Sequence, residues 1–249
     1  LAVASHVAET TAYGGNGVQI VDVSDPYNPS AAASMVDGTD GFTCLDGPQS
    51  VDILDIAGTP YLFVAAQDED CIQIADFSDP TDPVAVSTYG DMEGTYSYMD
   101  YPVAMKGVEV AGRYYALVNA RIDNTVVVVD VTDPSNPVEA SSMAYASAKS
   151  STGISFPGIG SGTATHCSIA IFKATSTFGS TSTFMVTVGY TSVGTMQLAD
   201  ISDPSNPIAV ADIAGSTSST SEFYMMRYYT RGLTVVESNG IFYALIAMD

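Results

Sequence analysis

Apolar residues along this chain come in short runs, and a turn signal follows the runs at intervals of about 8–12 residues. The clearest stretch predicts four strands, at residues 50–56, 61–66, 71–77 and 84–88. Between them stand Ala-Gly-Thr-Pro, an acidic tip Gln-Asp-Glu-Asp, and the turn Ser-Asp-Pro-Thr-Asp-Pro. Short strands separated by such turns indicate an all-β protein.

One phrase within this pattern occurs four times. It reads VQIVDVSDPYNP from Val18, IQIADFSDPTDP from Ile72, VVVVDVTDPSNP from Val126 and MQLADISDPSNP from Met196. Self-similarity at an interval of this size is typical of repeat architectures, in which each repeat is one supersecondary unit stacked on its neighbours. The chain is therefore predicted to be one repeat array.

The order of strands around the second copy recurs around the third and fourth copies. Strands are predicted at residues 104–110, 114–119, 125–131 and 138–143, and again at 166–173, 183–188, 194–201 and 208–213. One small, polar insertion, at residues 144–165, precedes the strands of the fourth repeat, and a second, at residues 174–182, lies within that repeat. Their Ser- and Thr-rich composition favours exposed loops that accept O-linked glycans.

The strand that carries the phrase is apolar on both faces. Val126 and Val128 lie on one face, and Val127 and Val129 lie on the other. A strand covered on both sides favours a sheet stacked between similar sheets over a two-layer sandwich. We therefore expect a β-propeller-type array of four-stranded antiparallel blades, about four to five in number. It forms a single domain over residues 1–249, with repeats near 1–40, 48–90, 102–145 and 165–215 and a partial repeat at 231–249.

The Ser/Thr-Asp-Pro-x-Asn/Asp-Pro part of the phrase has a structural explanation. Proline fixes its own φ, forces the preceding Asp into an extended conformation, and donates no hydrogen bond to a sheet. Hydroxyl and carboxylate side chains can bond the local amides. The turn thus ends one strand and begins the next, and the aspartates are predicted to hold it: Asp22, Asp25, Asp76, Asp79, Asp130, Asp133, Asp200 and Asp203.

These four phrases, each preceded by an apolar strand and a polar tip, resemble the LVIVD-repeat family of secreted and surface β-propeller proteins. The resemblance extends over most of the chain. It implies a propeller-like fold and an extracellular location, and it implies no assigned chemistry. Complete motifs number four, fewer than the six or seven blades expected of a typical member of such families, so a ring closed by this chain alone is in question.

Charge excludes one class of partner. Seven Lys and Arg against 28 Asp and Glu give a formal net charge of −21, and phosphate backbones need clusters of basic residues. Nucleic acid is therefore not expected as a partner. No apolar run reaches the length of about 18 residues that suggests a membrane span. Residue 1 is Leu and no basic segment precedes an apolar stretch, so we expect a signal peptide to be removed or to lie outside this segment.

Candidate chemical groups are few. His6 and His166 are the two histidines, and no nucleophile-elbow, phosphate-loop or HExxH motif occurs, so no catalytic residue and no cofactor are assigned. Asp68, Glu69, Asp70 and Asp123 connect second and third strands and are candidate Ca²⁺ ligands at one rim. Cys44 and Cys71 can form a disulfide; the alternative is three buried thiols, Cys167 included. The tyrosine-rich stretches 96–101 and 224–229 are predicted to pack between blades, or alternatively to form a glycan-stacking or adhesive surface.

The two ends of the chain match incomplete repeats. Residues 1–5 correspond to a second strand, and residues 232–237 and 241–248 correspond to a first and a second strand. Either these strands complete one blade within the chain, or they pair between neighbouring subunits and generate a filament. We expect an extracellular, non-enzymatic structural or interaction module that associates with itself or with other extracellular proteins or glycans. The alternatives are a module that binds a glycan, a peptide or a Ca²⁺-dependent partner, and a hydrolase or lyase with a central site.

Overall fold

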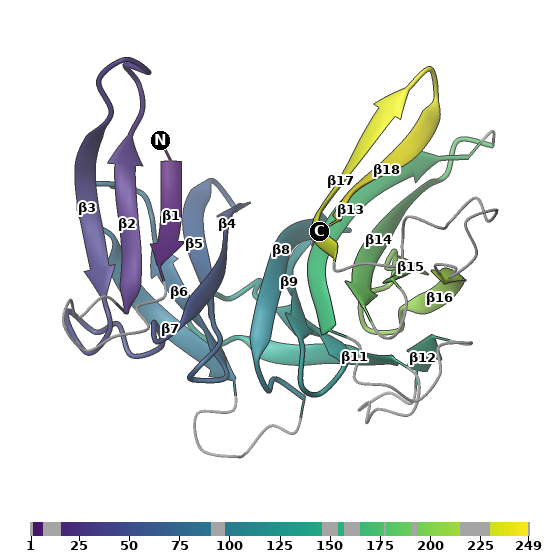
Figure 1. The fold of residues 1–249 in the computed structure, drawn as a ribbon, viewed down its shortest axis with the longest axis horizontal. Coiled ribbons are helices and arrows are strands. Elements are labelled where there is room, and N and C mark those ends of the chain that lie inside the picture. The colour runs from purple at the N-terminus through teal and green to yellow at the C-terminus, as the bar shows by residue number, and fades with distance from the viewer. Residues whose placement is uncertain are drawn as a thin grey trace.

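A computed structural model describes residues 2–6, 16–90, 98–145, 154–156, 165–176, 178–190, 194–214 and 230–248. These residues form strands and turns, and no helix among them is long and apolar enough to cross a bilayer. Figure 1 shows the strands as successive sheets arranged along an arc. The fold is all-β, as the spacing of apolar runs predicts.

The sheets follow one another in chain order, and within each sheet neighbouring strands of the repeat are antiparallel. The first sheet holds β1 (Ala2–His6), β2 (Gly17–Asp22) and β3 (Ser30–Val36). The second holds β4 (Pro48–Ile56), β5 (Thr59–Ala66), β6 (Cys71–Asp76) and β7 (Val84–Gly90). The third holds β8 (Pro102–Val110), β9 (Arg113–Ala120), β10 (Thr125–Asp130) and β11 (Val138–Tyr145), with β12 (Ile154–Phe156) beside β11.

The fourth sheet and a final pair of strands continue the array. The fourth sheet holds β13 (Thr165–Thr175), β14 (Thr181–Tyr190), β15 (Gly194–Asp200) and β16 (Ile208–Ala214). β17 (Thr230–Ser238) and β18 (Ile241–Met248) form a two-stranded sheet, which we call the C-terminal hairpin. Two complete four-stranded sheets and a third with an added strand thus lie between a three-stranded sheet and a hairpin.

Both polar insertions contribute strand structure that the sequence does not predict. Within the first, Ile154–Phe156 pairs in parallel with β11, where Met143 lies opposite Ile154. This three-residue strand occupies the outer edge of the third sheet, and its alternation is too short to recognise without the partner strand. The second insertion lengthens β13 and β14 to Thr175 and Thr181. The expectation that both insertions are simply exposed loops is therefore wrong over these residues.

The core consists of apolar layers between successive sheets. Val18, Ile20, Leu62 and Val64 belong to the layer between the first and second sheets. Val118 faces the second sheet, whereas its neighbour Leu117 faces the fourth. Successive side chains of a strand point to opposite faces, so a middle sheet contributes to two layers. The prediction of strands covered on both sides is confirmed.

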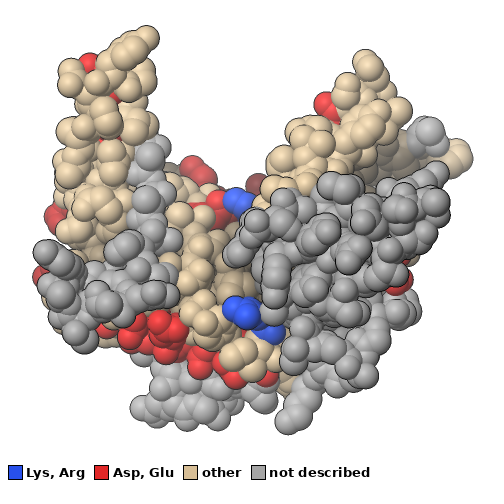
Figure 2. Space-filling model, in the orientation of Figure 1, with Lys and Arg blue, Asp and Glu red and all other residues tan. Residues whose placement is uncertain are grey.

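The first strands of successive sheets lie next to one another along the inside of the arc. β4 contacts β8, β8 contacts β13, and β13 contacts β17. The first sheet and the C-terminal hairpin form the two ends of the arc, and open space separates these arms in Figures 1 and 2. The chain is thus a β-propeller-type repeat array with a gap between its terminal elements.

Candidate functional sites along the array

The first aspartate of each repeated phrase closes a local turn. In all four copies its Oδ1 accepts a hydrogen bond, 2.8–2.9 Å long, from the amide two residues later; the donors are Ser24, Ser78, Thr132 and Ser202. Hydrogen bonds from Ser78 hold the pKa of the half-buried Asp76 below its usual range. Asp130 also forms an ion pair with Arg113.

The second aspartate of each phrase repeats this geometry one step further along. Its Oδ1 accepts from the amide two residues later at 2.9–3.1 Å; the donors are Tyr27, Thr81, Ser135 and Ser205. Its carbonyl oxygen accepts from the amide three residues later at 3.0–3.1 Å; the donors are Asn28, Asp82, Asn136 and Asn206. Each aspartate therefore serves the turn in which it stands.

The turns also join neighbouring sheets through serine hydroxyls. Ser87 Oγ donates to the carbonyl oxygen of Pro134 at 2.5 Å, and Ser141 Oγ donates to that of Pro204 at 2.6 Å. Each serine lies on the fourth strand of its repeat, β7 or β11, and reaches the turn of the following repeat. Sequence reasoning missed this contact, although serine recurs at the equivalent position of two repeats.

The acidic tips hold the segments that lead into each sheet. Glu69 Oε2 accepts from the amide of Asp46 at 2.9 Å, and Asp123 Oδ2 accepts from the equivalent amide of Asp100 at 2.8 Å. In addition, Asp70 Oδ1 reaches across to the next sheet and accepts from the amide of Tyr101 at 2.8 Å. These carboxylates join strand ends to inter-sheet connections.

The structure places the four candidate Ca²⁺ ligands in two groups, because Asp70 and Asp123 bond the consecutive amides of Tyr101 and Asp100, away from Asp68 and Glu69. Asp68 and Glu69 lie with Asp37 and Asp46 in one acidic group, where burial and neighbouring carboxylates raise the pKa of Glu69. Burial, then Asp68 and Asp37, raise the pKa of Asp46. Asp123 belongs to the tip of the third sheet. Binding of Ca²⁺ by these residues stays a prediction.

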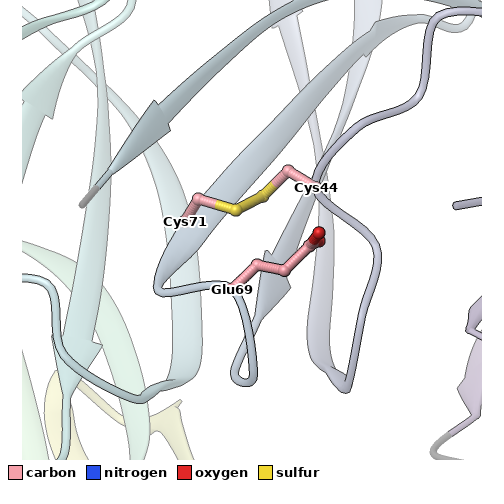
Figure 3. A group of neighbouring side chains, drawn as sticks. All are labelled: Cys44, Glu69 and Cys71. Atoms are coloured by element: carbon pink, nitrogen blue, oxygen red, sulfur yellow. A yellow bond between two sulfur atoms is a disulfide. The ribbon is translucent and has the colours of Figure 1, made fainter. Parts of the chain in front are cut away.

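A disulfide lies beside this acidic group. Cys44 and Cys71 are bonded, with their Cα atoms 6.2 Å apart, and both are fully buried. Figure 3 shows the Glu69 side chain beside the bonded sulfurs. The disulfide prediction is confirmed. Because both sulfurs are in the bond, neither is available as a thiolate ligand for a metal.

A cavity of about 550 Å³ lies along the inside of the arc, between β4, β8, β13 and β17. Its polar wall includes Asp52, whose Oδ1 lies 3.1 Å from Nζ of Lys106 and whose Oδ2 accepts from the amide of Gly107 at 2.8 Å. Ser50 Oγ likewise accepts from the amide of Met105 at 3.1 Å. Asp52 and Ser50 thus connect β4 to β8, and Lys173 lines the same cavity.

The C-terminal hairpin has one uncovered apolar face. Val236 lies opposite Tyr243, as Val108 lies opposite Tyr115 in the third sheet. The matching sequences, IFYALIAM and RYYALVNA, also make Leu245 equivalent to Leu117. Val236, Tyr243 and Leu245 are 40%, 47% and 53% exposed, whereas their three equivalents are 6%, 4% and 0% exposed. We call Val236, Tyr243 and Leu245 the C-terminal face.

The first sheet has an uncovered face at the opposite end of the array. Val23 is 37% exposed, whereas the equivalent Phe77, Val131 and Ile201 are at most 3% exposed. Gln19 is exposed, whereas its equivalent Gln73 is buried. We call Gln19, Val21 and Val23 the N-terminal face. The sequence could not show that these positions are uncovered in the first repeat, because the equivalent positions of the other repeats carry similar residues and are covered.

The histidines, the third cysteine and the two tyrosine-rich stretches are the remaining candidates from the sequence. The side chains of His6, His166 and Cys167, and residues 224–229, lie outside the described residues. In the other tyrosine-rich stretch, Tyr98 packs against the layer between the second and third sheets. The guanidinium of Arg121 stacks over Tyr101 at 5.3 Å from the ring centre. The described part of that stretch therefore contributes to packing.

Comparison with known proteins gives a family and a fold. The family model "LVIVD repeat" matches residues 11–37, 50–91, 105–144 and 190–214. No curated protein matches the sequence. Among solved structures, an exo-β-1,3-galactanase of Phanerochaete chrysosporium, in complex with β-1,3-galactotriose, aligns over 89% of this chain and 47% of its own, at a TM-score of 0.53 and 12% identity. A GH43 β-1,3-galactosidase aligns over 93% of this chain and 46% of its own, at a TM-score of 0.51 and 11% sequence identity. The chain spans about half the length of these structures, and the likeness shows the fold alone.

Proposed function

The chain belongs to the LVIVD repeat family, and we propose that it acts outside the cell as a non-enzymatic interaction module, whose partners bind the uncovered faces at the ends of the array. The observation that carries this proposal is the C-terminal face. Its three apolar side chains are 40–53% exposed where the same positions of the third sheet are nearly fully buried. Contiguous exposed apolar residues of this kind mark interaction sites in proteins.

Two observations support an extracellular location. The Cys44–Cys71 disulfide is a bond that persists in oxidising compartments and is rare in the cytosol of most organisms. A formal net charge of −21 and a small number of basic residues suit a secreted surface that repels nonspecific contacts. Acidic side chains outnumber basic ones on the face seen in Figure 2.

The acidic side chains form structural hydrogen bonds within the fold, and this favours a scaffold over an enzyme. Glycoside hydrolysis uses a pair of carboxyl groups on either side of the scissile bond. Among the described residues of the inner cavity, Asp52 is the one acidic side chain. Both of its oxygens bond β8, through Lys106 and Gly107. The repeated aspartates of the phrase are likewise engaged in their own turns.

Photocrosslinking in the cells that produce the protein tests the interaction role. A photoreactive phenylalanine analogue replaces Tyr243 on the C-terminal face, and the control replaces Tyr27, which is 93% exposed in a turn. We expect a discrete crosslinked protein from position 243 and none from position 27. Absence of a crosslink at position 243 in correctly located, folded protein would overturn the proposal.

The non-enzymatic part has its own test. Purified protein is incubated with β-1,3-galactotriose and with a panel of other oligosaccharides, and the products are separated by chromatography. We expect no hydrolysis by the unmodified chain. Turnover that is lost in Asp52→Asn would instead assign a hydrolase activity to the inner cavity.

A further inference from the structure

The geometry points to a specific partner for the C-terminal face: the N-terminal face of a second copy of this chain, docked head to tail. This inference rests on the proposed interaction role and names its partner. The contact would repeat, between two molecules, the packing that joins the third and fourth sheets within one molecule.

The layer between the third and fourth sheets shows what each face fits. On the third sheet this layer includes Val108, Tyr115 and Leu117, which are the equivalents of the C-terminal face. On the fourth sheet it includes Ala199 and Ile201, each at most 1% exposed. The side of a sheet that carries Leu117 therefore packs against the side that carries Ala199 and Ile201.

The same two sides are the ones left uncovered at the ends of the array. Asp22 and Asp200 are equivalent residues of the repeated phrase, so Val21 corresponds to Ala199 and Val23 corresponds to Ile201. Leu245 corresponds to Leu117 on the hairpin. A sheet carrying Val21 and Val23 is thus the natural neighbour of a hairpin carrying Leu245.

The orientation of each end element agrees with this pairing. The rings of Phe242 and Phe172 lie 4.9 Å apart, so the opposite side of β18 packs on the fourth sheet and leaves the C-terminal face outward. Val18 and Ile20 pack toward the second sheet, which leaves Val21 and Val23 on the outward side of the first sheet. The two faces are at opposite ends of the array, separated by the opening in Figure 1.

A second copy can dock on either face while the strand pairing within each chain is kept. Among the described strands, those of the first sheet pair with one another and those of the hairpin pair with one another. A head-to-tail contact leaves one face of each kind free at the ends of the pair, so it propagates into a chain of subunits or closes into a larger ring. Because each copy carries a charge of −21, the copies repel, and added salt screens this repulsion and favours the contact.

Two variants that each disable one face test the pairing. Leu245→Asp places a charge on the C-terminal face, and Val23→Asp places one on the N-terminal face. Val84→Asp is the control, because Val84 is 58% exposed and belongs to neither face. Each protein is examined by analytical ultracentrifugation at moderate salt, alone and in equimolar mixtures, and circular dichroism verifies that each is folded.

The head-to-tail contact predicts a distinctive pattern. The unmodified chain and Val84→Asp form assemblies of two or more copies, whereas Leu245→Asp and Val23→Asp are each monomeric. Their mixture forms a one-to-one dimer and nothing larger, because one intact face of each kind remains. Repeating the measurement at lower salt weakens association of the unmodified chain.

Three results would overturn the inference: a monomeric unmodified chain, dimers of Val23→Asp alone, or a mixture of the two variants that stays monomeric. Dimers of Val23→Asp alone would show that two C-terminal faces meet each other. A monomeric unmodified chain combined with a crosslink from position 243 to a different protein would leave the interaction role standing and remove the second copy as its partner.

Discussion

Replacing each of two equivalent leucines by alanine should cost different amounts of stability, because one lies on a covered face and the other on an uncovered face. Leu117 and Leu245 occupy the same position of the repeat, one at 0% and the other at 53% exposure. Leu117→Ala removes a side chain surrounded by Val108, Val128 and Ile169 in a closed layer. Such a change loses the burial of the deleted carbons and leaves a cavity, and it costs about 2–5 kcal/mol.

Leu245→Ala should cost much less in the separated chain. Half of the side chain is already in contact with solvent, and no enclosed cavity forms when it is shortened. The loss is therefore limited to part of the burial of the deleted carbons, about 1 kcal/mol or less. The two substitutions remove the same atoms, so the difference between them reports coverage alone.

Urea unfolding at low protein concentration measures this difference. The chain has 15 tyrosines and no tryptophan, so tyrosine fluorescence and far-ultraviolet circular dichroism follow the transition. We expect a large decrease of the midpoint for Leu117→Ala and a small one for Leu245→Ala. Equal decreases in a sample shown to be monomeric would mean that the chain itself covers the hairpin, and the account of an uncovered C-terminal face would be refuted.

Three further predictions concern the scaffold. Replacing both Cys44 and Cys71 by alanine should lower the free energy of unfolding by about 3–4 kcal/mol, the loop-closure value for the 27-residue separation, measured by urea unfolding. Burial and nearby aspartates raise the pKa of Glu69, so the folded chain holds this proton more tightly than the unfolded chain and loses stability as pH rises. In unfolding series from about pH 4 to pH 7, Glu69→Gln should flatten this dependence of stability on pH. An unchanged slope would contradict the prediction. Ser87→Ala removes the hydrogen bond to the carbonyl oxygen of Pro134 and should cost about 1 kcal/mol in the same assay, whereas a neutral effect would mean that the bond contributes nothing to joining the sheets.

Local features of the repeat could be predicted from residues close together in the sequence. Alternating apolar positions place Val126 and Val127 on opposite faces of one strand, and the structure buries both between sheets. The Asp-Pro pairs restrict the backbone within a few residues, which is why the turn positions were predictable. The phrase itself identifies the repeat and therefore the propeller-type stacking.

Contacts between distant residues depended on the tertiary structure. The ion pair of Asp52 with Lys106 and the bond from Ser87 to Pro134 join neighbouring sheets. The sequence of either segment alone does not identify the partner residue in the other sheet. The acidic tips offered the same carboxylates for Ca²⁺ or for backbone amides, and only the position of the next inter-sheet connection shows that Asp70 reaches Tyr101.

The coverage of the terminal faces shows the limit most clearly. Leu117 and Leu245 both follow Tyr-Ala, both precede a β-branched residue and occupy the same place in the repeat, so local reasoning assigns them one environment. The structure buries the first and exposes the second because a following sheet packs on β9, while the arc leaves open space beyond β18. Whether such an arc meets its own beginning depends on small rotations between sheets that accumulate along the array, and these rotations are set by packing between segments far apart in the chain.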